Sequence, residues 1–258
     1  MDAITNIRDL ALLTKDCVEE ALWPTRCAVC DRPGSVLCSS CRHDLPYLDT
    51  WRACPICGAA FGRLQCTECN PVMLKAGGYG ALPFEGCTSA LMFNARSSRI
   101  PRAFKDHGAR DLGPVMARLM FDSLTPEWVG RCQAVTFIPA TRAAVKRRGF
   151  DHGQELAEHL GKLCNLPARG LLPRPHSTDQ RKLSRTQRFS NMRQVFQNSR
   201  SEEARCGPGR RSPPAPSPPK RVLLADDVMT TGSTLFSAAT ALKDLGVEQV
   251  WCVTFLRV

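Results

Sequence analysis

Two carboxylates stand side by side in this sequence, at Asp226 and Asp227, between an apolar run and a turn rich in hydroxyl residues. The apolar run, Val222 to Ala225, predicts a short buried strand, and the turn predicts the start of a helix. The turn comprises Thr230, Thr231, Gly232, Ser233 and Thr234. Backbone N–H groups at such a helix start bind anions, which predicts a phosphate site. The carboxylates would repel a phosphate, so they suit ribose hydroxyls and a Mg²⁺ ion.

This combination resembles the 5-phosphoribosyl-1-pyrophosphate (PRPP) signature of type I phosphoribosyltransferases. The resemblance implies that Asp226 and Asp227 are the catalytic carboxylates that hold the ribose, and that the turn from Thr230 to Thr234 binds the 5-phosphate. The simpler interpretation is an acidic strand end followed by an ordinary helix cap. Transferases that act on 6-oxopurines resemble this pattern with an Asp in place of Thr230, and no base for an acceptor is visible in the sequence.

Cations upstream of this signature suit the pyrophosphate part of such a ligand. Lys105 lies in a helix expected from Ile100 to His107, and Arg147 and Arg148 follow a strand expected from Val135 to Ile138. A basic loop after a strand is well placed to bind pyrophosphate, because Arg offers paired N–H donors. Without the downstream signature, a solvated basic loop would be an equally good interpretation.

Eight cysteines form four C-x2-C pairs. They are Cys27, Cys30, Cys38, Cys41, Cys54, Cys57, Cys66 and Cys69. Each pair can bring two thiolates to one ion, and two pairs complete a closed tetrahedral zinc site with four thiolate ligands. The spacing therefore predicts two structural Zn²⁺ ions, whereas the alternative, disulfides, is disfavoured in a reducing compartment. The simpler arrangement is that consecutive C-x2-C pairs share one ion, but the first and third C-x2-C pairs could instead do so.

The charge and hydropathy of the chain favour anionic partners. Counting eight thiolates and two Zn²⁺ ions lowers the formal net charge of +11 to +7, which is still basic. Phosphate-rich ligands or polyanions are therefore the expected partners. No stretch approaches the 18 apolar residues of a membrane span, and acids occupy the place of a signal peptide's apolar core. We expect a cytoplasmic protein without membrane insertion.

Alternating strands and helices predict an α/β domain with a mainly parallel sheet flanked by helices. Strands are expected at Ala90 to Phe93, at Leu171-Leu172 and at Val250 to Leu256. The apolar faces of the helices between them are expected at Leu112, Val115, Met116, Leu119 and Met120, at Leu156, Leu160 and Leu163, and at Leu235, Ala239, Leu242 and Leu245.

The chain divides into a short helix, a small module and a main domain. Residues 1–25 predict a helix, 26–76 a double zinc ribbon, and 79–258 the α/β domain. The stretch 198–219 holds six prolines and little apolar surface, so we expect a disordered insertion within the main domain.

Together these features make the chain similar to the ComF family (competence protein F), which joins a double zinc ribbon to a type I phosphoribosyltransferase domain. The resemblance rests on the cysteines, the PRPP signature and three shorter motifs. Those motifs are Phe104-Lys105, Arg148-Gly149-Phe150 and the spacing Gln180/Leu183/Arg188/Asn191/Phe196. Two departures stand out: the family's P-V-P is Pro139-Ala140-Thr141 here, and its R-G-F-N-Q ends in Asp151-His152.

The resemblance implies a protein that binds PRPP or a related phosphorylated ligand and assists the uptake or handling of single-stranded DNA in natural competence, with the DNA-uptake machinery as partner. The alternative is an active Mg²⁺-dependent phosphoribosyltransferase that moves ribose 5-phosphate from PRPP to a nucleobase or amine. Between Thr141 and Arg193, twelve Lys and Arg stand against four acids. That excess predicts weak, sequence-independent binding of single-stranded DNA.

Overall fold

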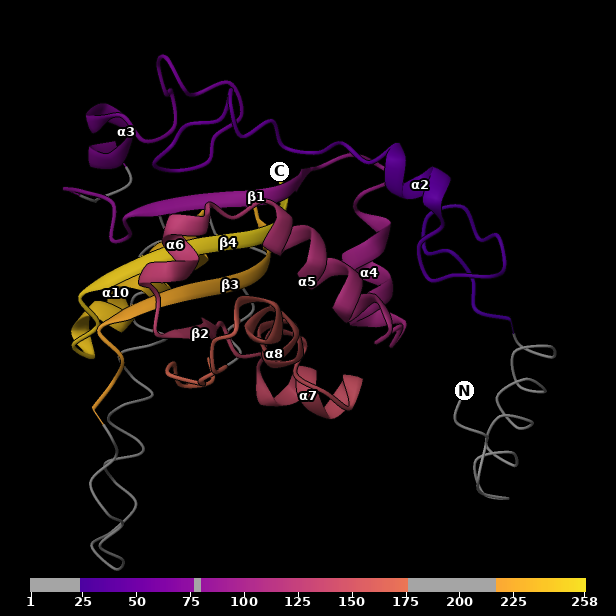
Figure 1. Cartoon of the computed structure of the whole chain (residues 1–258). Helices are drawn as coiled ribbons and strands as arrows, with labels where there is room; N and C mark the ends of the chain where they lie inside the picture. The colour runs from indigo at the N-terminus through magenta and orange to yellow at the C-terminus, as the bar shows by residue number, and fades with distance from the viewer. Residues whose placement is uncertain (1–23, 77–79, 176–216) are drawn as a thin grey trace, which may run out of the picture. The chain divides into compact units, whose positions relative to one another are not determined.

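The computed structural model describes residues 24–76, 80–175 and 217–258 (Figure 1). The chain falls into two compact units, one ending at Leu45 and the other running from Pro46 to Val258. Their boundary lies between the two cysteine quartets. The predicted helix over 1–25 and the Pro-rich insertion at 198–219 lie outside the described residues, apart from a few flanking positions, and so does the spacing from Gln180 to Phe196.

The first unit is organised around its four cysteines. An isolated antiparallel bridge joins Arg26 to Pro33, and the short helix α2 (Ser39–His43) begins directly after Cys38. Cys27 and Cys41 are buried. A segment this short has almost no apolar core, so its fold depends on whatever draws the thiols together.

The second unit contains a four-stranded parallel sheet in the order β1-β4-β3-β2. The strands are β1 (Gly86–Met92), β2 (Ala134–Phe137), β3 (Arg221–Met229) and β4 (Gln249–Arg257). The last strand of the chain therefore lies inside the sheet, between β1 and β3. Its side chains are almost all buried, as expected for a parallel sheet that is covered on both faces.

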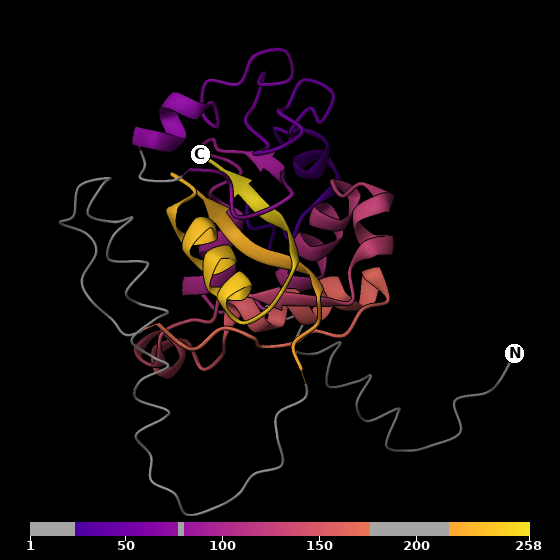
Figure 2. The same cartoon turned by 90° about the vertical axis from the view of Figure 1, so that its left-hand side faces the viewer.

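Helices cover both faces of this sheet. Helix α10 (Ser233–Asp244) packs on one face with Val222, Leu224, Val250 and Cys252, and helices α5 (Leu112–Asp122) and α8 (His152–Cys164) pack together on the other (Figure 2). The other helices among the described residues of this unit are α3 (Pro71–Ala76), α4 (Arg99–Asp106), α6 (Pro126–Arg131) and α7 (Arg142–Arg148). The predicted α/β class, a mainly parallel sheet flanked by helices, is confirmed.

Two sequence-based expectations about local structure were wrong. Leu171-Leu172 does not form a strand: Ala168 makes an isolated parallel bridge to Val135, and Leu172 packs into the core beneath α10. Leu163 of α8 is 36% exposed, because Cys164 takes the buried position at the end of that helix. In both cases the pattern of apolar residues in the sequence predicted a strand or a buried position that the fold does not give these residues.

Candidate functional site

The two carboxylates lie within β3, which continues through both of them. Successive side chains of a strand point to opposite faces, so Asp226 and Asp227 have different neighbours. Asp227 is 4% exposed, and its Oδ2 forms an ion pair with Nζ of Lys105 from α4. Asp226 is partly buried, and its Oδ1 accepts a hydrogen bond from the Asp227 N–H at 2.9 Å.

The neighbours set the protonation of this pair. Burial, followed by the negative charge of Asp227, raises the pKa of Asp226 to about 8. Burial acts most strongly against the charged form of Asp227, but Lys105, His152 and a hydrogen bond with Asp226 together outweigh it, and the pKa of Asp227 is lowered. In the unliganded protein near neutral pH, Asp227 is therefore charged and Asp226 largely protonated. An added cation would favour the charged form of both.

The turn after β3 leads directly into α10. Gly232 adopts a left-handed conformation (φ +74°) and caps α10, with its carbonyl accepting the Phe236 N–H at 2.9 Å. The hydroxyls of Thr231 and Ser233 lie 3.0 Å apart, and Thr230 is exposed. The turn therefore places hydroxyls and the first amides of a twelve-residue helix at the carboxyl edge of the sheet, where open α/β folds bind ligands.

The cysteines gather in two consecutive quartets, the first ending at Cys41 and the second beginning at Cys54. Within each quartet the sulfur atoms lie within 4.8 Å of one another. The sulfur distances are 3.7 Å for Cys30–Cys38, 3.7 Å for Cys54–Cys69 and 3.5 Å for Cys57–Cys66. Four thiolates at about 2.3 Å from a tetrahedral Zn²⁺ would lie about 3.8 Å apart. Both quartets therefore fit structural Zn²⁺ ions, and the crossed pairing is excluded.

Comparison with known proteins shows which family and which relative the chain resembles. Residues 143–258 match the family model of the phosphoribosyl transferase domain. Over 225 residues the chain is 25% identical to "Competence protein F" of Haemophilus influenzae, a match that covers 83% of this chain and 88% of that protein. The chain is therefore similar to competence protein F and matches the phosphoribosyl transferase domain in its C-terminal part. Within its described residues, none of the helices has both the length and the apolar character to cross a membrane.

The ComF-like chain completes its site with residues from outside the matched span. Lys105 and Asp106 come from α4, far upstream of residue 143. Arg148 of α7 donates to Asp106 Oδ1 at 3.0 Å and lies 3.2 Å from Nδ1 of His152. Since a guanidinium has no acceptor, Nδ1 of His152 must accept and is unprotonated. Burial, followed by the positive charge of Lys105, lowers the pKa of His152 to about 4.

His152 is a site residue that our sequence analysis did not assign. Asp151, which precedes His152 in the same departure from the family pattern, has a structural role. Its carboxylate caps α8 by accepting from Gly153 and Gln154, and it accepts the Ala140 N–H at 3.1 Å. Arg174 donates to both Asp151 (2.7 Å) and the Ala140 carbonyl (2.9 Å). The altered loop after β2 is thus tied to the altered start of α8.

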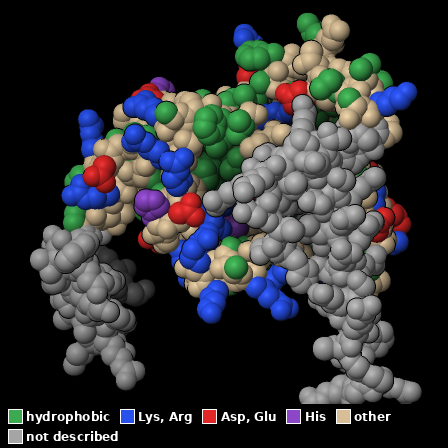
Figure 3. All heavy atoms as spheres, turned by 180° about the vertical axis from the view of Figure 1, so that it is seen from behind, with side chains coloured by type: hydrophobic (Ala, Val, Ile, Leu, Met, Phe, Trp, Pro, Cys, Tyr) green, Lys and Arg blue, Asp and Glu red, His purple; other side chains and the backbone are tan. Residues whose placement is uncertain are grey.

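The basic residues after β2 form a helix, not the loop that we expected. Thr141 caps α7 by accepting the Ala144 N–H at 3.2 Å, and the helix ends at Gly149 with φ +80°. Neighbouring residues of a helix cannot face the same side, so Arg148 turns toward Asp106 while Arg147 is exposed. On the face shown in Figure 3, Lys and Arg side chains gather over α4 and α7.

Proposed function

We propose that this ComF-like protein binds PRPP together with Mg²⁺ at the carboxyl edge of β3. The observation that carries the proposal is the pair Asp226 and Asp227, held next to Lys105 and directly followed by the phosphate-type turn. Carboxylates, a partly buried cation and a helix start correspond to the ribose, the pyrophosphate and the 5-phosphate of one ligand.

In this proposal the turn from Thr230 to Thr234 holds the 5-phosphate through backbone amides and hydroxyls. Asp226 and Asp227 hold the ribose hydroxyls, and their hard oxygen atoms suit Mg²⁺, which would neutralise charge on the pyrophosphate. A cation bound here would favour the charged form of Asp226, whose pKa is raised by burial and, after that, by the negative charge of Asp227. Lys105 would pair with Asp227 in the free protein and with pyrophosphate in the complex. Arg148 would add a second positive charge for the pyrophosphate.

Thermal shift and titration calorimetry test this proposal. PRPP with Mg²⁺ should raise the unfolding temperature of the full chain, with ATP as a control of similar charge and ribose 5-phosphate and pyrophosphate as fragments. Each fragment should bind more weakly than PRPP, since each reaches only part of the site. Equal stabilisation by ATP and PRPP would reject a dedicated PRPP site.

We further propose that the protein assists the handling of single-stranded DNA in natural competence, in the cytoplasm and beside the uptake machinery. The relative's name supports this role. So do the exposed cations of α7, Arg142, Lys146 and Arg147, and two exposed aromatic rings, Trp51 and Phe61. The Arg63 guanidinium lies 5.6 Å from the Trp51 ring centre. Cations and exposed rings are the two components of sequence-tolerant single-strand binding.

Fluorescence anisotropy with a labelled thymidine oligonucleotide tests the DNA role. Affinity should fall with salt, with a log-log slope of roughly −0.7 per phosphate contacted. Lys146→Glu with Arg147→Glu should weaken binding, whereas Lys146→Gln with Arg147→Gln should weaken it less. A wild-type protein without affinity at low salt would refute the role and leave the PRPP proposal standing.

A second candidate is transfer of ribose 5-phosphate from PRPP to a nucleobase or amine. The observation that favours it is His152, a neutral imidazole whose Nδ1 accepts from Arg148, so that its Nε2–H can donate a hydrogen bond that positions the acceptor. Release of pyrophosphate, measured over a panel of nucleobases and amines, tests it. His152→Ala should lower transfer by about a hundredfold and leave PRPP affinity similar, because it removes a donor that positions the acceptor. No release with any acceptor would leave PRPP as a bound ligand only.

A further inference from the structure

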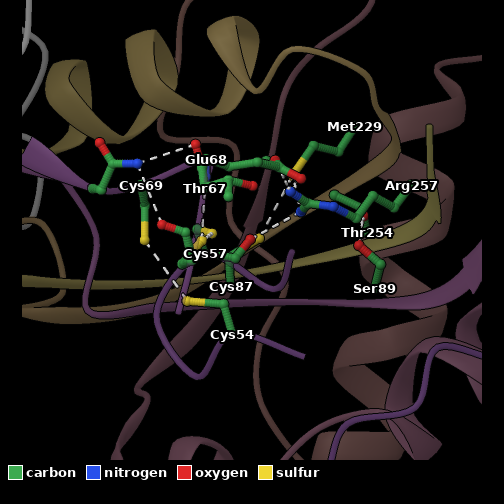
Figure 4. Close-up of polar contacts among 12 residues, drawn as sticks. Cys54, Cys57, Thr67, Glu68, Cys69, Cys87, Ser89, Met229, Thr254 and Arg257 are labelled. Atoms are coloured by element: carbon green, nitrogen blue, oxygen red, sulfur yellow. Dashed lines mark hydrogen bonds and ion pairs between the residues drawn. The ribbon is translucent and has the colours of Figure 1, made fainter. Parts of the chain in front are cut away.

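Arg257, at the end of β4, is a charged residue in an almost fully buried position. The residue is 2% exposed, and both terminal nitrogens of its side chain have partners (Figure 4). Nη1 donates to the Cys57 carbonyl at 2.9 Å and lies 3.2 Å from the Met229 sulfur, while Nη2 forms an ion pair with Glu68. An arginine is rarely this buried unless its partners are fixed in place. Two of these partners, Cys57 and Glu68, belong to the second cysteine loop, which runs from Cys54 to Cys69.

The second cysteine loop packs directly on the sheet at this point. Gly58 has φ +72°, and a Cβ there would lie 2.7 Å from the Cys87 carbonyl of β1. The loop's own buried cluster contains only Cys54, Cys57 and Ala59. Its conformation must therefore depend on the metal that the four thiols fit, because so small a cluster contributes little folding free energy. The position of the Cys57 carbonyl follows from that conformation.

Arg257 also connects this loop with the turn after β3. Met229 is its partner in the β3–β4 register, and the Met229 carbonyl accepts the Val258 N–H at 2.9 Å. Met229 is the last residue of β3, and its terminal methyl lies 2.9 Å from where a Cβ on Gly232 would be. Contacts thus run without interruption from the thiols of the second quartet through Arg257 and Met229 to Gly232.

We propose that the second zinc site positions the turn from Thr230 to Thr234, with Arg257 as the positioning residue. If the metal leaves, the Cys57 carbonyl is no longer held in place. The buried Arg257 guanidinium then loses this acceptor and must move to find another, because an unsatisfied buried donor is costly. Met229 and Gly232 move with it, and the turn loses its anion-binding shape. The first zinc site, which belongs to the other compact unit, should not have this effect. That the turn binds phosphate rests on the proposed function, whereas its dependence on zinc does not.

Hydrogen exchange of the unliganded, full-length protein tests the proposal. The reporter is the Phe236 N–H, which donates to Gly232, and the amides of α5 provide the internal reference. The matched variants are Cys69→Ser in the second quartet and Cys41→Ser in the first, each checked for loss of one zinc. Cys69→Ser should speed Phe236 exchange by about tenfold relative to α5 through local opening, and Cys41→Ser should leave it unchanged.

Substitutions that keep all eight thiols separate positioning from unfolding of the loop. Arg257→Gln should raise the same exchange by about fivefold with zinc content intact, and adding Cys69→Ser should raise it by less than the product of the two effects. Glu68→Gln, at a half-exposed partner, should have a smaller effect in the same direction. Arg257→Lys, which keeps the charge, should restore part of the protection.

The results of these experiments distinguish two kinds of failure. Unchanged Phe236 exchange in both Cys69→Ser and Arg257→Gln would overturn the positioning role, and so would equal effects of Cys69→Ser and Cys41→Ser. If PRPP with Mg²⁺ failed to slow exchange in the wild-type turn, the proposed ligand would be wrong. The zinc dependence of the free turn would still be decided.

Discussion

The two cysteine quartets share one spacing pattern and similar sulfur geometry, yet they belong to different parts of the protein. The first organises a short unit that ends at Leu45. The second lies in the same unit as the sheet, contacts β1 at Gly58, and gives Arg257 two of its partners. The same metal-binding motif can therefore stabilise a small module in one place and support a ligand-binding domain in another. A role assigned from cysteine spacing alone would not distinguish the two.

Removal of one zinc ligand from each quartet should give the largest difference in stability between the two regions. Wild-type protein should carry two zinc ions, and Cys57→Ser and Cys30→Ser should each carry one. Cys57→Ser should lower the free energy of unfolding of the sheet domain by about 4 kcal/mol, since metal binding there is coupled to the fold. Cys30→Ser should leave that free energy nearly unchanged. Metal analysis and urea unfolding measure both, and equal destabilisation would remove the distinction between the quartets.

Two glycines with positive φ allow the same comparison without touching a zinc ligand. Gly34, in the first cysteine loop, has φ +105° and open space where a Cβ would be, whereas a Cβ on Gly58 would overlap the Cys87 carbonyl. Gly34→Ala should cost about 1 kcal/mol of unfolding free energy from backbone strain alone. Gly58→Ala should cost about 3 kcal/mol, because overlap adds to the strain. Similar costs would mean that the second loop is not held against β1.

Much of this organisation could be predicted because its signals are local. The cysteine quartets, β3 and the start of α10 are each specified by residues within a few positions of one another. His152 was missed because two of the charges that act on it, Lys105 and Asp227, are distant in the chain. The role of Arg257 is hidden for the same reason, since Cys57 and Met229 reach it only through the fold.

Other errors came from local signals that allow two interpretations. The helix α7 was taken for a loop because its charges were weighed more heavily than the cap at Thr141 and the helix-forming residues after it. Leu171-Leu172 was taken for a strand, since an apolar pair cannot show whether its backbone joins a ladder. The geometry of Asp151 could have been anticipated, because Asp is a favoured residue before a helix.

The smallest predicted effect concerns the exposed rings, which the described part of the first unit lacks. If Trp51 stacks on bases, Trp51→Ala should weaken binding of single-stranded DNA by about 1 kcal/mol, roughly fivefold in Kd. Leu64→Ala on the same loop removes a fully exposed aliphatic side chain and is the matched control. Anisotropy at low salt measures both. Equal losses of affinity would show that DNA binding does not depend on stacking at Trp51.

The central claim is that the carboxyl edge of β3 binds PRPP, and calorimetry on one double variant tests it most directly. Asp226→Asn with Asp227→Asn keeps the size of both side chains and removes the charges that would hold ribose and Mg²⁺. Zinc content should stay at two, and affinity for PRPP with Mg²⁺ should fall at least about a hundredfold, since hydrogen bonds to charged groups contribute about 1.5–3 kcal/mol each. Measurable wild-type binding of PRPP that the double variant retains in full would contradict the assignment of this site.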